Sequence, residues 1–538
     1  MFGMTAKQWR EANPDLKGNI RDYATINELF FLSNMENINA VLINDGVSQG
    51  ERLVKLNQTL MEKWVRLTFL AQIFGGLSQI AYLCTRNYKL LQMKKIVTLF
   101  LFSLMAFFAN LQAKVVYMAT DGSDSSAGTV DAPLATLPAA YHQIASGDTI
   151  CVRGGRYAIT DEQVMKTDRN YAFVFALEKG GSPSHRTCLM GYPGERPVFD
   201  CSALQLDGQH RFAVFYLGAD YLHLRNFDIV GVPVRMKGHT QSECVSARKG
   251  SHCIVENIAM HDGMAIGYYQ TAGSDNLVLN CDAYNNYDDY SEGDYGGNVD
   301  GFGVHVQDTA FTGNVIRYCR AWRNSDDGFD LINNLAPVEF DHCWAFYNGF
   351  RPTADARDTS TFHSAGDGNG FKAGGYGMKR SRTRCPAVCP QNYIHHCVAY
   401  HNKAHGLYAN HHLGGCRWEN NSAWMNRSNY NMVNRKTTDE AVDVPGYGHI
   451  LRNNVSFAFA DASDGGHLIN CDASRCIVEN NSFAPSETTV AVSAEQFVSL
   501  DPASLFLPRD AEGNLPEMTF LLAKPGSLLA ERKMGWHE

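Results

Sequence analysis

The sequence lacks three features, each of which would have indicated a class of protein. It has no hydrophobic run long enough to cross a membrane, because the run Ile96–Phe108 spans 13 residues and a spanning helix needs about 20. It has no excess of basic residues, since 47 Lys and Arg stand against 56 Asp and Glu and the formal net charge is −9. It also lacks the polar bias of a disordered chain, because 45% of its residues are hydrophobic. These absences exclude a stable membrane span in the mature form, a nucleic-acid-binding surface and extensive disorder.

The N-terminal part of the chain contains the three parts of a secretory signal at an internal position. A basic Met-Lys-Lys start precedes the apolar run Ile96–Phe108, and Leu111-Gln112-Ala113 ends on a small residue suited to cleavage. We therefore predict a signal peptide over residues 93–113, a secreted protein (extracellular or periplasmic) and a mature domain over residues 114–538. Residues 1–92 differ in character from the rest, and we interpret them as a non-native extension or an unrelated N-terminal segment.

A six-residue pattern, Cys-x-Ala-aromatic-x-Asn, recurs along the chain. It starts at Cys281, Cys319, Cys343 and Cys397, and a variant with Asn in place of Cys starts at Asn421. Several of the steps between copies are 24 residues long. Such periods are typical of solenoids, in which each coil buries its apolar face against its neighbours and insertions emerge on one side. The sequence therefore predicts an all-β solenoid of coils of about 24 residues, with long loops on one side and a capping helix near residues 137–144.

The same pattern predicts two stacks of side chains inside the solenoid. Its cysteines share one inward position, where a thiol behaves as a small apolar residue, so we interpret them as stacked free thiols and not as disulfides. Its asparagines predict an amide ladder that bonds successive coils, made of Asn286, Asn324, Asn348, Asn402 and Asn426. Cys385 and Cys389 lie in a loop, where they either pair with each other or cap a local turn.

A second repeat carries the charged residues. The segments 300–303, 327–330, 369–372 and 405–408 share the order polar, Gly, large apolar, variable. If they are successive rungs of a parallel sheet, equivalent residues lie about 4.8 Å apart.

This register predicts a cluster of four carboxylates, from Asp300, Asp326, Asp327 and Asp330, with Lys372 beside Asp330. Like charges so close repel unless a cation or bound protons intervene. Calcium is the natural occupant, because it takes hard oxygen ligands in irregular geometry.

Three insertions lengthen the coils that carry these residues, and the last contains Arg380, Arg382 and Arg384. Arginine can bind a carboxylate through two parallel hydrogen bonds, which makes these residues candidates for gripping an acidic substrate. A solvated basic face is the alternative, and both interpretations stay open.

Four motifs carry a family resemblance: Asn298–Phe302, Asn324–Asp330, Cys343–Phe346 and Asn369–Gly375. Together they resemble the pectate lyases of polysaccharide lyase family 9, and the resemblance covers roughly residues 115–535. It implies a right-handed parallel β-helix that cleaves polygalacturonate, the acidic polysaccharide of pectin, by calcium-assisted β-elimination.

Carried over residue by residue, the resemblance implies that Asp300, Asp326, Asp327 and Asp330 ligate Ca²⁺ and that Lys372 is the Brønsted base. Val299 and the larger loops at 287–297 and 350–368 depart from the family pattern, which leaves substrate length and branching open.

The implied chemistry needs a metal, because the C5 proton of a uronate is acidic only when the adjacent carboxylate is neutralised, and a bound cation can do this. Burial and a neighbouring dication are expected to lower the pKa of Lys372, so that a useful fraction is neutral.

Three other functions stay open. A β-helical glycoside hydrolase, such as a polygalacturonase, would use Asp326 and Asp327 as acid and base. A uronate epimerase would return the proton to the other face of the sugar. A noncatalytic carbohydrate-binding solenoid would use calcium only to brace its turns. Lys372 discriminates among these functions, because neither the hydrolase nor the binding protein requires it. We expect a monomer.

Overall fold

The computed structural model describes residues 113–537 except residues 207, 239, 292–295, 352–365, 377–386, 438–439, 441, 458–465 and 484–490. The contacts within the chain separate a unit that begins at Ala113 from the residues before it. The predictions for residues 1–92 and 93–113, apart from Ala113 itself, lie outside the described residues. In the described part of the chain, no helix has both the length and the apolar character needed to span a membrane.

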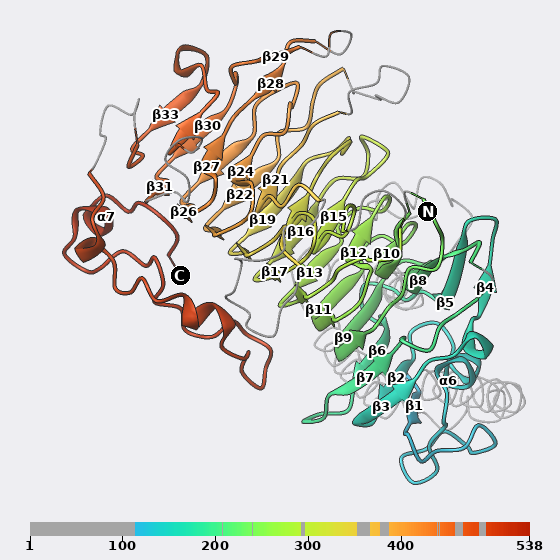
Figure 1. Cartoon of the computed structure of the whole chain (residues 1–538). Helices are drawn as coiled ribbons and strands as arrows, with labels where there is room; N and C mark the ends of the chain where they lie inside the picture. The colour runs from blue at the N-terminus through green and yellow to red at the C-terminus, as the bar shows by residue number, and fades with distance from the viewer. Residues whose placement is uncertain are drawn as a thin grey trace, which may run out of the picture. The chain divides into compact units, whose positions relative to one another are not determined.

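The described chain winds into a parallel β-helix whose coils stack in sequence order (Figure 1). A full coil contributes three short strands, and each strand pairs in parallel with its equivalents in the preceding and following coils. The strands thus form three ladders. The first two ladders belong to one sheet of 20 strands and the third to a sheet of 11 strands.

The first ladder contains β1 (Val115–Met118), β2 (Thr149–Val152), β6 (Thr187–Gly191), β9 (Leu222–Val230), β11 (Ile254–His261), β13 (Leu277–Leu279), β16 (Asn314–Arg317), β19 (Val338–Asp341), β22 (Tyr393–His395), β25 (Arg417–Glu419), β30 (Ile450–Arg452) and β33 (Ile477–Glu479). The long strands β9 and β11 continue into the second ladder, which also contains β3 (Gly155–Ala158), β7 (Pro197–Asp200), β14 (Asp282–Tyr284), β17 (Arg320–Trp322), β20 (Trp344–Phe346), β23 (Val398–Tyr400), β26 (Ser422–Trp424) and β31 (Val455–Ser456).

The third ladder contains β5 (Tyr171–Leu177), β8 (Arg211–Leu217), β10 (Glu243–Ala247), β12 (Ile266–Gln270), β15 (Phe302–Val304), β18 (Phe329–Asp330), β21 (Phe371–Lys372), β24 (His405–Tyr408), β27 (Ser428–Asn431) and β32 (Leu468–Ile469). The antiparallel strands are β4 (Lys166–Thr167), which pairs with β5, and the pair β28 (Asn434–Arg435) and β29 (Asp443–Val444). The helical turns are α6 (Leu137–Gln143), η1 (Asp161–Gln163), η3 (Ala473–Arg475), η4 (Ala494–Gln496), η5 (Pro502–Phe506) and α7 (Leu528–Glu531).

The corner between the first and second ladders needs a residue in the left-handed region of the backbone. Asn280 and Asn420 have φ of 55° there, as asparagine tolerates this conformation well. In two coils the same corner position is occupied by histidine, His342 and His396, both with φ of 52°. The corner therefore stacks one side chain per coil along the outside of the solenoid.

The predicted amide ladder is confirmed. Asn286 Nδ2 donates to Asn324 Oδ1 over 3.0 Å, and the same bond continues through Asn348 and Asn402 to Asn426. The predicted thiol stack is also confirmed: Cys281, Cys319, Cys343 and Cys397 are buried and unpaired. Because Cys385 is outside the described residues, both alternatives for Cys385 and Cys389, pairing with each other and capping a local turn, stay open.

Replacement of Asn348 by alanine should destabilise the coils. Asn348 Oδ1 accepts from the backbone N of Asn324, and Asn348 Nδ2 donates to Ala321 O at 3.0 Å and to Asn402 Oδ1 at 3.0 Å. The substitution leaves these buried groups without partners, so we expect the free energy of unfolding to fall by about 2–4 kcal/mol in urea titrations. The control Asn514→Ala removes an exposed asparagine that bonds to Asp510, and should change stability by less than about 0.5 kcal/mol. Equal effects of the two substitutions would contradict a structural role for the ladder.

The predicted capping helix is confirmed as α6, which lies at the end of the stack where the first coils begin (Figure 1). Thr136 provides the N-cap, and Leu137, Ala140 and Tyr141 are buried against the first coils. The helix thereby covers apolar side chains that have no preceding coil to pack against.

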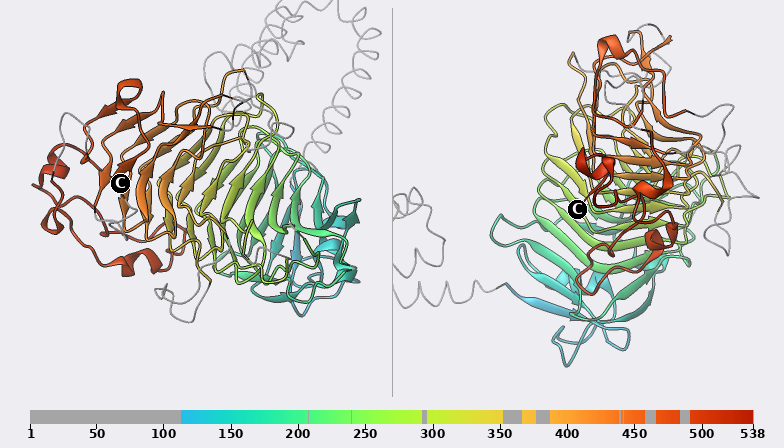
Figure 2. Two further views of the ribbon diagram at one scale, coloured as in Figure 1. Left: turned by 45° about the horizontal axis from the view of Figure 1, so that its top comes forward. Right: turned by 90° about the vertical axis from the view of Figure 1, so that its left-hand side faces the viewer.

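The segment after β33 lies along the second ladder (Figure 2). Phe520 and Trp536 of this segment are buried with Trp344, Phe346 and Tyr400 of the ladder in one apolar cluster.

A buried ion-pair network also holds this segment in place. Asp282 Oδ1 lies 2.7 Å from Arg509, and Asp282 Oδ2 lies 2.7 Å from Arg320. The segment therefore closes one side of the solenoid and leaves its end, at His537, near the corner histidines.

Candidate active site

Four consecutive rungs of the third ladder bring the predicted site residues together. Phe302 pairs with Phe329, Phe329 with Phe371, and Phe371 with Leu407. The three phenylalanine rings stack with centroids 5.0 and 4.8 Å apart. Inward stacking of these rings sets the register, and the predicted alignment of the four segments is confirmed.

Three of the predicted carboxylates form a compact group. Asp300, Asp326 and Asp327 each offer an oxygen, and these oxygens lie within 4.8 Å of one another. Backbone and amide donors orient the group: Asp327 Oδ1 accepts from Asn369 N at 2.6 Å and from Asn369 Nδ2 at 2.8 Å. Asp326 Oδ2 accepts from Asn298 N at 2.8 Å. The arrangement is therefore fixed by the turn before each third-ladder strand.

Asp330 and Lys372 lie side by side at the edge of this group. The Lys372 side chain is only 7% exposed, and its Nζ lies 2.9 Å from Asp327 Oδ2 and 3.3 Å from Asp330 Oδ2. Asp330 Oδ1 accepts from Ile332 N at 2.7 Å. Asp327 and Asp330 thus both face the lysine, and Asp327 also belongs to the group of three carboxylates.

Burial changes the acidities of these groups strongly. Burial, together with the charge of Asp327, raises the pKa of Asp326 to about 7. Burial also raises the pKa of Asp327 and of Asp330 to about 6, against the opposing effect of Lys372. The pKa of Asp300 is raised well above its usual range by burial and by its three carboxylate neighbours. Without a cation, the four carboxylates therefore do not all ionise near neutral pH.

The pKa of Lys372 moves in the opposite direction from the prediction. Burial acts to lower it, but the neighbouring carboxylates, Asp327 and Asp330 foremost, outweigh burial and raise it well above its usual value. The prediction assumed a dication beside the amine. In the carboxylate cage alone the amine is protonated.

The residues fit a hard divalent cation. Every donor in the cluster is oxygen, which suits calcium or magnesium better than softer metals. Asp327 Oδ2 is buried without a hydrogen-bond partner among the described residues. This oxygen lies 2.9 Å from Lys372 Nζ, with which it forms an ion pair. Because Asp327 Oδ2 accepts no hydrogen bond from the described residues, it can coordinate an ion without losing one.

Three further residues adjoin the site and were not identified from the sequence. Asp367 Oδ2 lies 3.6 Å from Lys372 Nζ. Lys403 Nζ donates to the backbone oxygen of Gly366 over 2.6 Å. His305 is largely covered, with a side chain 13% exposed, and its Nε2 lies 3.7 Å from Asp330 Oδ2. Of these three residues, His305 could have been found from the strand register.

Gly303 pairs with Asp330 in the third ladder. Because glycine has no side chain, the coil before Asp330 leaves space next to this carboxylate, and the side chain of His305 can reach it. A Cβ added to Gly303 would lie 3.6 Å from His305 Nε2. Arg380, Arg382 and Arg384 lie outside the described residues, and their role stays a prediction.

Comparison with known proteins places this site in a family. A family model described as the Pel9A-like, right-handed β-helix region matches residues 116–454. The chain belongs to this family. Its members include the pectate lyases of polysaccharide lyase family 9, so the resemblance drawn from the motifs is confirmed, as is the right-handed parallel β-helix.

Two curated relatives are both named as pectate lyases. Pectate lyase L of Dickeya dadantii (strain 3937) is 31% identical over 77% of this chain and 85% of its own length. Pectate lyase PEL9 of Emericella nidulans is 27% identical over 60% of this chain and 75% of its own length.

Two solved structures resemble this family member closely in fold. A rhamnogalacturonan lyase is 41% identical, with a TM-score of 0.71, and the match covers 79% of this chain and 99% of that one. The crystal structure of pectate lyase Pel9A is 28% identical, with a TM-score of 0.59, and the match covers 78% of this chain and 91% of that one. This chain is therefore an enzyme, a polysaccharide lyase.

Proposed function

We propose that the enzyme is a calcium-dependent lyase that cleaves a galacturonate-containing polysaccharide by β-elimination, with Lys372 as the Brønsted base. The observation that carries the proposal is the position of a buried lysine one rung beyond a cluster of buried carboxylates, with its amine 2.9 Å from Asp327.

Asp300, Asp326, Asp327 and Asp330 would hold the calcium ion. When bound, calcium neutralises the uronate carboxylate and so makes the C5 proton more acidic. The residues of the chain orient the ligands and accept the proton. The backbone N–H groups of Asn298 and Asn369 keep the carboxylates in place, and Lys372 Nζ takes the proton from C5.

Proton removal is followed by departure of the oxygen on C4, which leaves a double bond between C4 and C5. To accept the proton the amine must be neutral, although the surrounding carboxylates raise its pKa. The reaction therefore requires compensation of the carboxylate charge, which the proposed ion provides, and it gains from alkaline pH.

The site is less suited to glycoside hydrolysis. An acid and base pair needs free carboxyl groups on either side of the bond and room for a water or a nucleophile. Asp326 instead accepts backbone hydrogen bonds on both oxygens, from Asn298 N at 2.8 Å and from Asp367 N at 2.6 Å. Such a carboxylate is held as a ligand and is poorly placed to move a proton.

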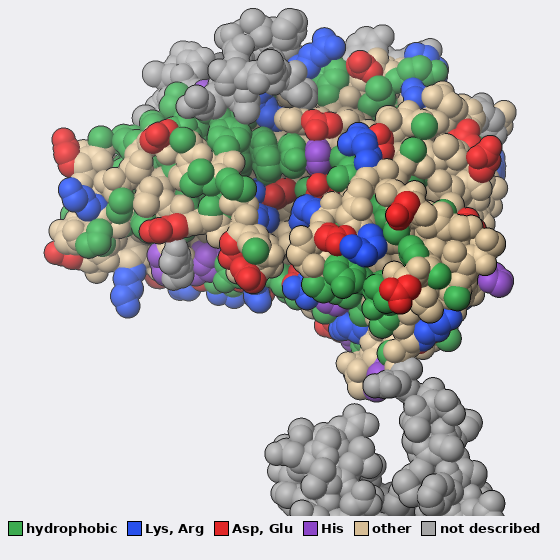
Figure 3. Space-filling view, turned by 90° about the horizontal axis from the view of Figure 1, so that it is seen from below, with side chains coloured by type: hydrophobic (Ala, Val, Ile, Leu, Met, Phe, Trp, Pro, Cys, Tyr) green, Lys and Arg blue, Asp and Glu red, His purple; other side chains and the backbone are tan. Residues whose placement is uncertain are grey.

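The polymer is either polygalacturonate or rhamnogalacturonan, and each has specific support. The pectate lyases among the relatives favour the first, whereas the 41% identity with a rhamnogalacturonan lyase favours the second. On the face in Figure 3, acidic and basic side chains are interspersed. Arg380, Arg382 and Arg384 stay candidates for contacts with the acidic polymer.

Ultraviolet absorbance of an unsaturated uronide tests the proposal directly. The enzyme is incubated with each polymer, with calcium and with excess chelator. We expect absorbance to grow with calcium on one or both polymers and to stop when the chelator is added. Release of saturated reducing ends without this absorbance would mean hydrolysis, and no product from either polymer would contradict the proposed substrate class.

We also propose that the enzyme acts outside the cytoplasm, with residues 93–113 as its signal peptide. The secretory pattern of this segment supports the proposal. N-terminal sequencing of secreted protein tests it, and any peptide from residues 1–92 in the mature material would contradict it.

A further inference from the structure

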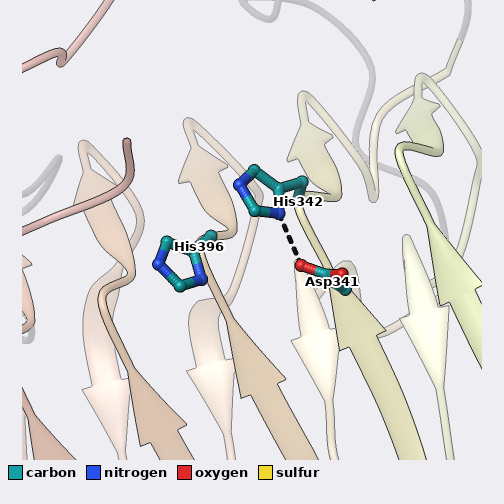
Figure 4. Close-up of side chains that lie close together, drawn as sticks. All are labelled: Asp341, His342 and His396. Carbon is teal, nitrogen blue, oxygen red and sulfur yellow. Dashed lines mark hydrogen bonds and ion pairs between the residues drawn. The ribbon is translucent and has the colours of Figure 1, made fainter. Parts of the chain in front are cut away.

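A second cluster of ligand-type side chains lies at the corner of the first and second ladders, on residues that the lyase chemistry does not use. β19 ends at Asp341 and β22 ends at His395, and these two residues are paired across the ladder. The next residue in each coil is the corner histidine, His342 or His396. Stacking of two coils therefore places one carboxylate and three imidazoles together, as Figure 4 shows for Asp341, His342 and His396.

The ligand atoms of this group converge. His342 Nδ1 lies 2.5 Å from Asp341 Oδ1, and His395 Nδ1 lies 3.4 Å from the same oxygen. His395 Nδ1 also lies 2.9 Å from His396 Nδ1. The ligand atoms of Asp341, His342 and His396 lie within 4.8 Å of one another, and His395 lies beside both Asp341 and His396. The side chains of Asp341 and His395 are only 9% and 11% exposed.

The hydrogen bonds of His342 leave its Nδ1 with a lone pair in the neutral ring. His342 Nε2 lies 3.0 Å from the backbone oxygen of His537, and because a carbonyl only accepts, this nitrogen carries the proton. The neutral ring then presents a bare Nδ1 to the Asp341 oxygen. Two acceptors at 2.5 Å repel unless a cation or an added proton lies with them.

The same pattern recurs at His395. Its Nε2 lies 3.3 Å from Glu339 Oε1, and this carboxylate orients the ring with Nδ1 as the free acceptor. That Nδ1 faces both Asp341 Oδ1 and His396 Nδ1. A histidine whose distal nitrogen donates to a carboxylate or a backbone carbonyl is the arrangement that usually orients metal-bound imidazoles.

We propose that Asp341, His342 and His396, with His395 beside them, form a binding site for a transition-metal cation such as Zn²⁺. Zinc takes imidazole and carboxylate ligands at about 2.0–2.1 Å in tetrahedral geometry, which separates neighbouring ligand atoms by about 3.3 Å. The pairs described above lie 2.5, 2.9 and 3.4 Å apart, whereas the rings of His342 and His396 stack with centroids 4.7 Å apart, so one of these rings turns when the ion binds. Nitrogen donors favour zinc over calcium, so the site differs in kind from the carboxylate cluster.

The surroundings complete the site. Arg317 Nε donates to Asp341 Oδ2 over 2.5 Å, which leaves Oδ1 to the metal. A cavity of about 600 Å³, lined by His342 among others, adjoins the cluster and offers a route from solvent. His396 Nε2 lies 3.3 Å from His537 Nε2. The bound metal would therefore also fasten the C-terminal segment to the coils.

Metal analysis of the full chain without an affinity tag tests the proposal. After chelator treatment and dialysis against zinc, we expect one tightly held zinc per chain and a rise in the melting temperature. Cobalt in its place should give the visible absorption of a tetrahedral site. His396→Ala and Asp341→Asn should each weaken zinc binding by about 100-fold or more and remove the cobalt signal.

His261→Ala is the matched control. His261 also pairs with an aspartate, Asp262 at 2.7 Å, and stacks on Tyr284, but this pair is not among the clusters with three ligands. This variant should keep the zinc. If Asp341→Asn is folded by circular dichroism and binds zinc like the unaltered chain, or if the unaltered chain retains no zinc, the proposal is wrong.

Discussion

Lys372→Met should lower turnover by about 10²- to 10⁴-fold at saturating calcium, the usual effect of removing a general base. Methionine keeps most of the aliphatic bulk of a side chain that is 7% exposed, so the fold should persist. Calcium affinity should not fall, since the substitution removes a positive charge 2.9 Å from Asp327 and 3.3 Å from Asp330. Initial rates from unsaturated-product absorbance, with calcium titrations by calorimetry, separate the two effects.

The control is Lys166→Met, which removes a lysine paired with Glu178 at 2.6 Å whose side chain is 47% exposed. It should retain near-normal turnover. If Lys372 served only as an ion-pair partner, its substitution would leave turnover at saturating calcium almost unaltered. A Lys372→Met enzyme with more than about a tenth of normal turnover would defeat the assignment of the base.

The pH dependence of the unaltered enzyme adds a second readout. The base is active when neutral, and the carboxylates raise its pKa, so the rate should climb as pH increases. The ligands act in the same direction. The pKa of Asp326 is about 7, and that of Asp327 and Asp330 about 6, so calcium affinity should fall as pH drops through this range. In Lys372→Met the residual rate should lose the alkaline rise.

Asp327→Asn should abolish activity by removing calcium. Asn can keep the hydrogen bonds that Asp327 Oδ1 accepts from Asn369 at 2.6 and 2.8 Å, whereas its amide nitrogen would replace the oxygen that has no hydrogen-bond partner. Loss of even an outer partner of a metal ligand costs about 10- to 100-fold in affinity. For this direct ligand we expect a loss of about 100-fold or more in calorimetry, with activity falling in step.

Asp308→Asn serves as the control, because Asp308 is exposed and, among the described residues, its side chain accepts a hydrogen bond from Ala310 N at 2.9 Å. Its calcium affinity and activity should be normal. The two substitutions should leave the circular dichroism spectrum of the coils unchanged. Unaltered calcium affinity in Asp327→Asn would remove Asp327 from the ligand set and with it the proposed position of the ion.

The repeat in the sequence was enough to predict the coil period, the register and the inward stacks. A parallel β-helix repeats the same environment in every coil, so equivalent positions carry similar residues and the coils can be aligned from the sequence. The Asn286–Asn426 ladder and the pairing of Asp330 with Lys372 follow from this. The capping helix was predictable for a local reason, the Thr136 cap followed by an apolar face.

How the side chains of the site are grouped depends on the tertiary structure. The register brought the four carboxylates close, but side-chain direction placed Asp327 and Asp330 beside Lys372 and grouped Asp327 with Asp300 and Asp326. The pKa of Lys372 likewise depends on the balance of burial against several charges, which no spacing reveals. The histidine cluster needed still more, because His342 meets His396 one coil later and His537 arrives 195 residues along the chain from His342. A repeat predicts which residues are neighbours along the stack, whereas contacts made by a returning segment depend on the packing of the whole fold.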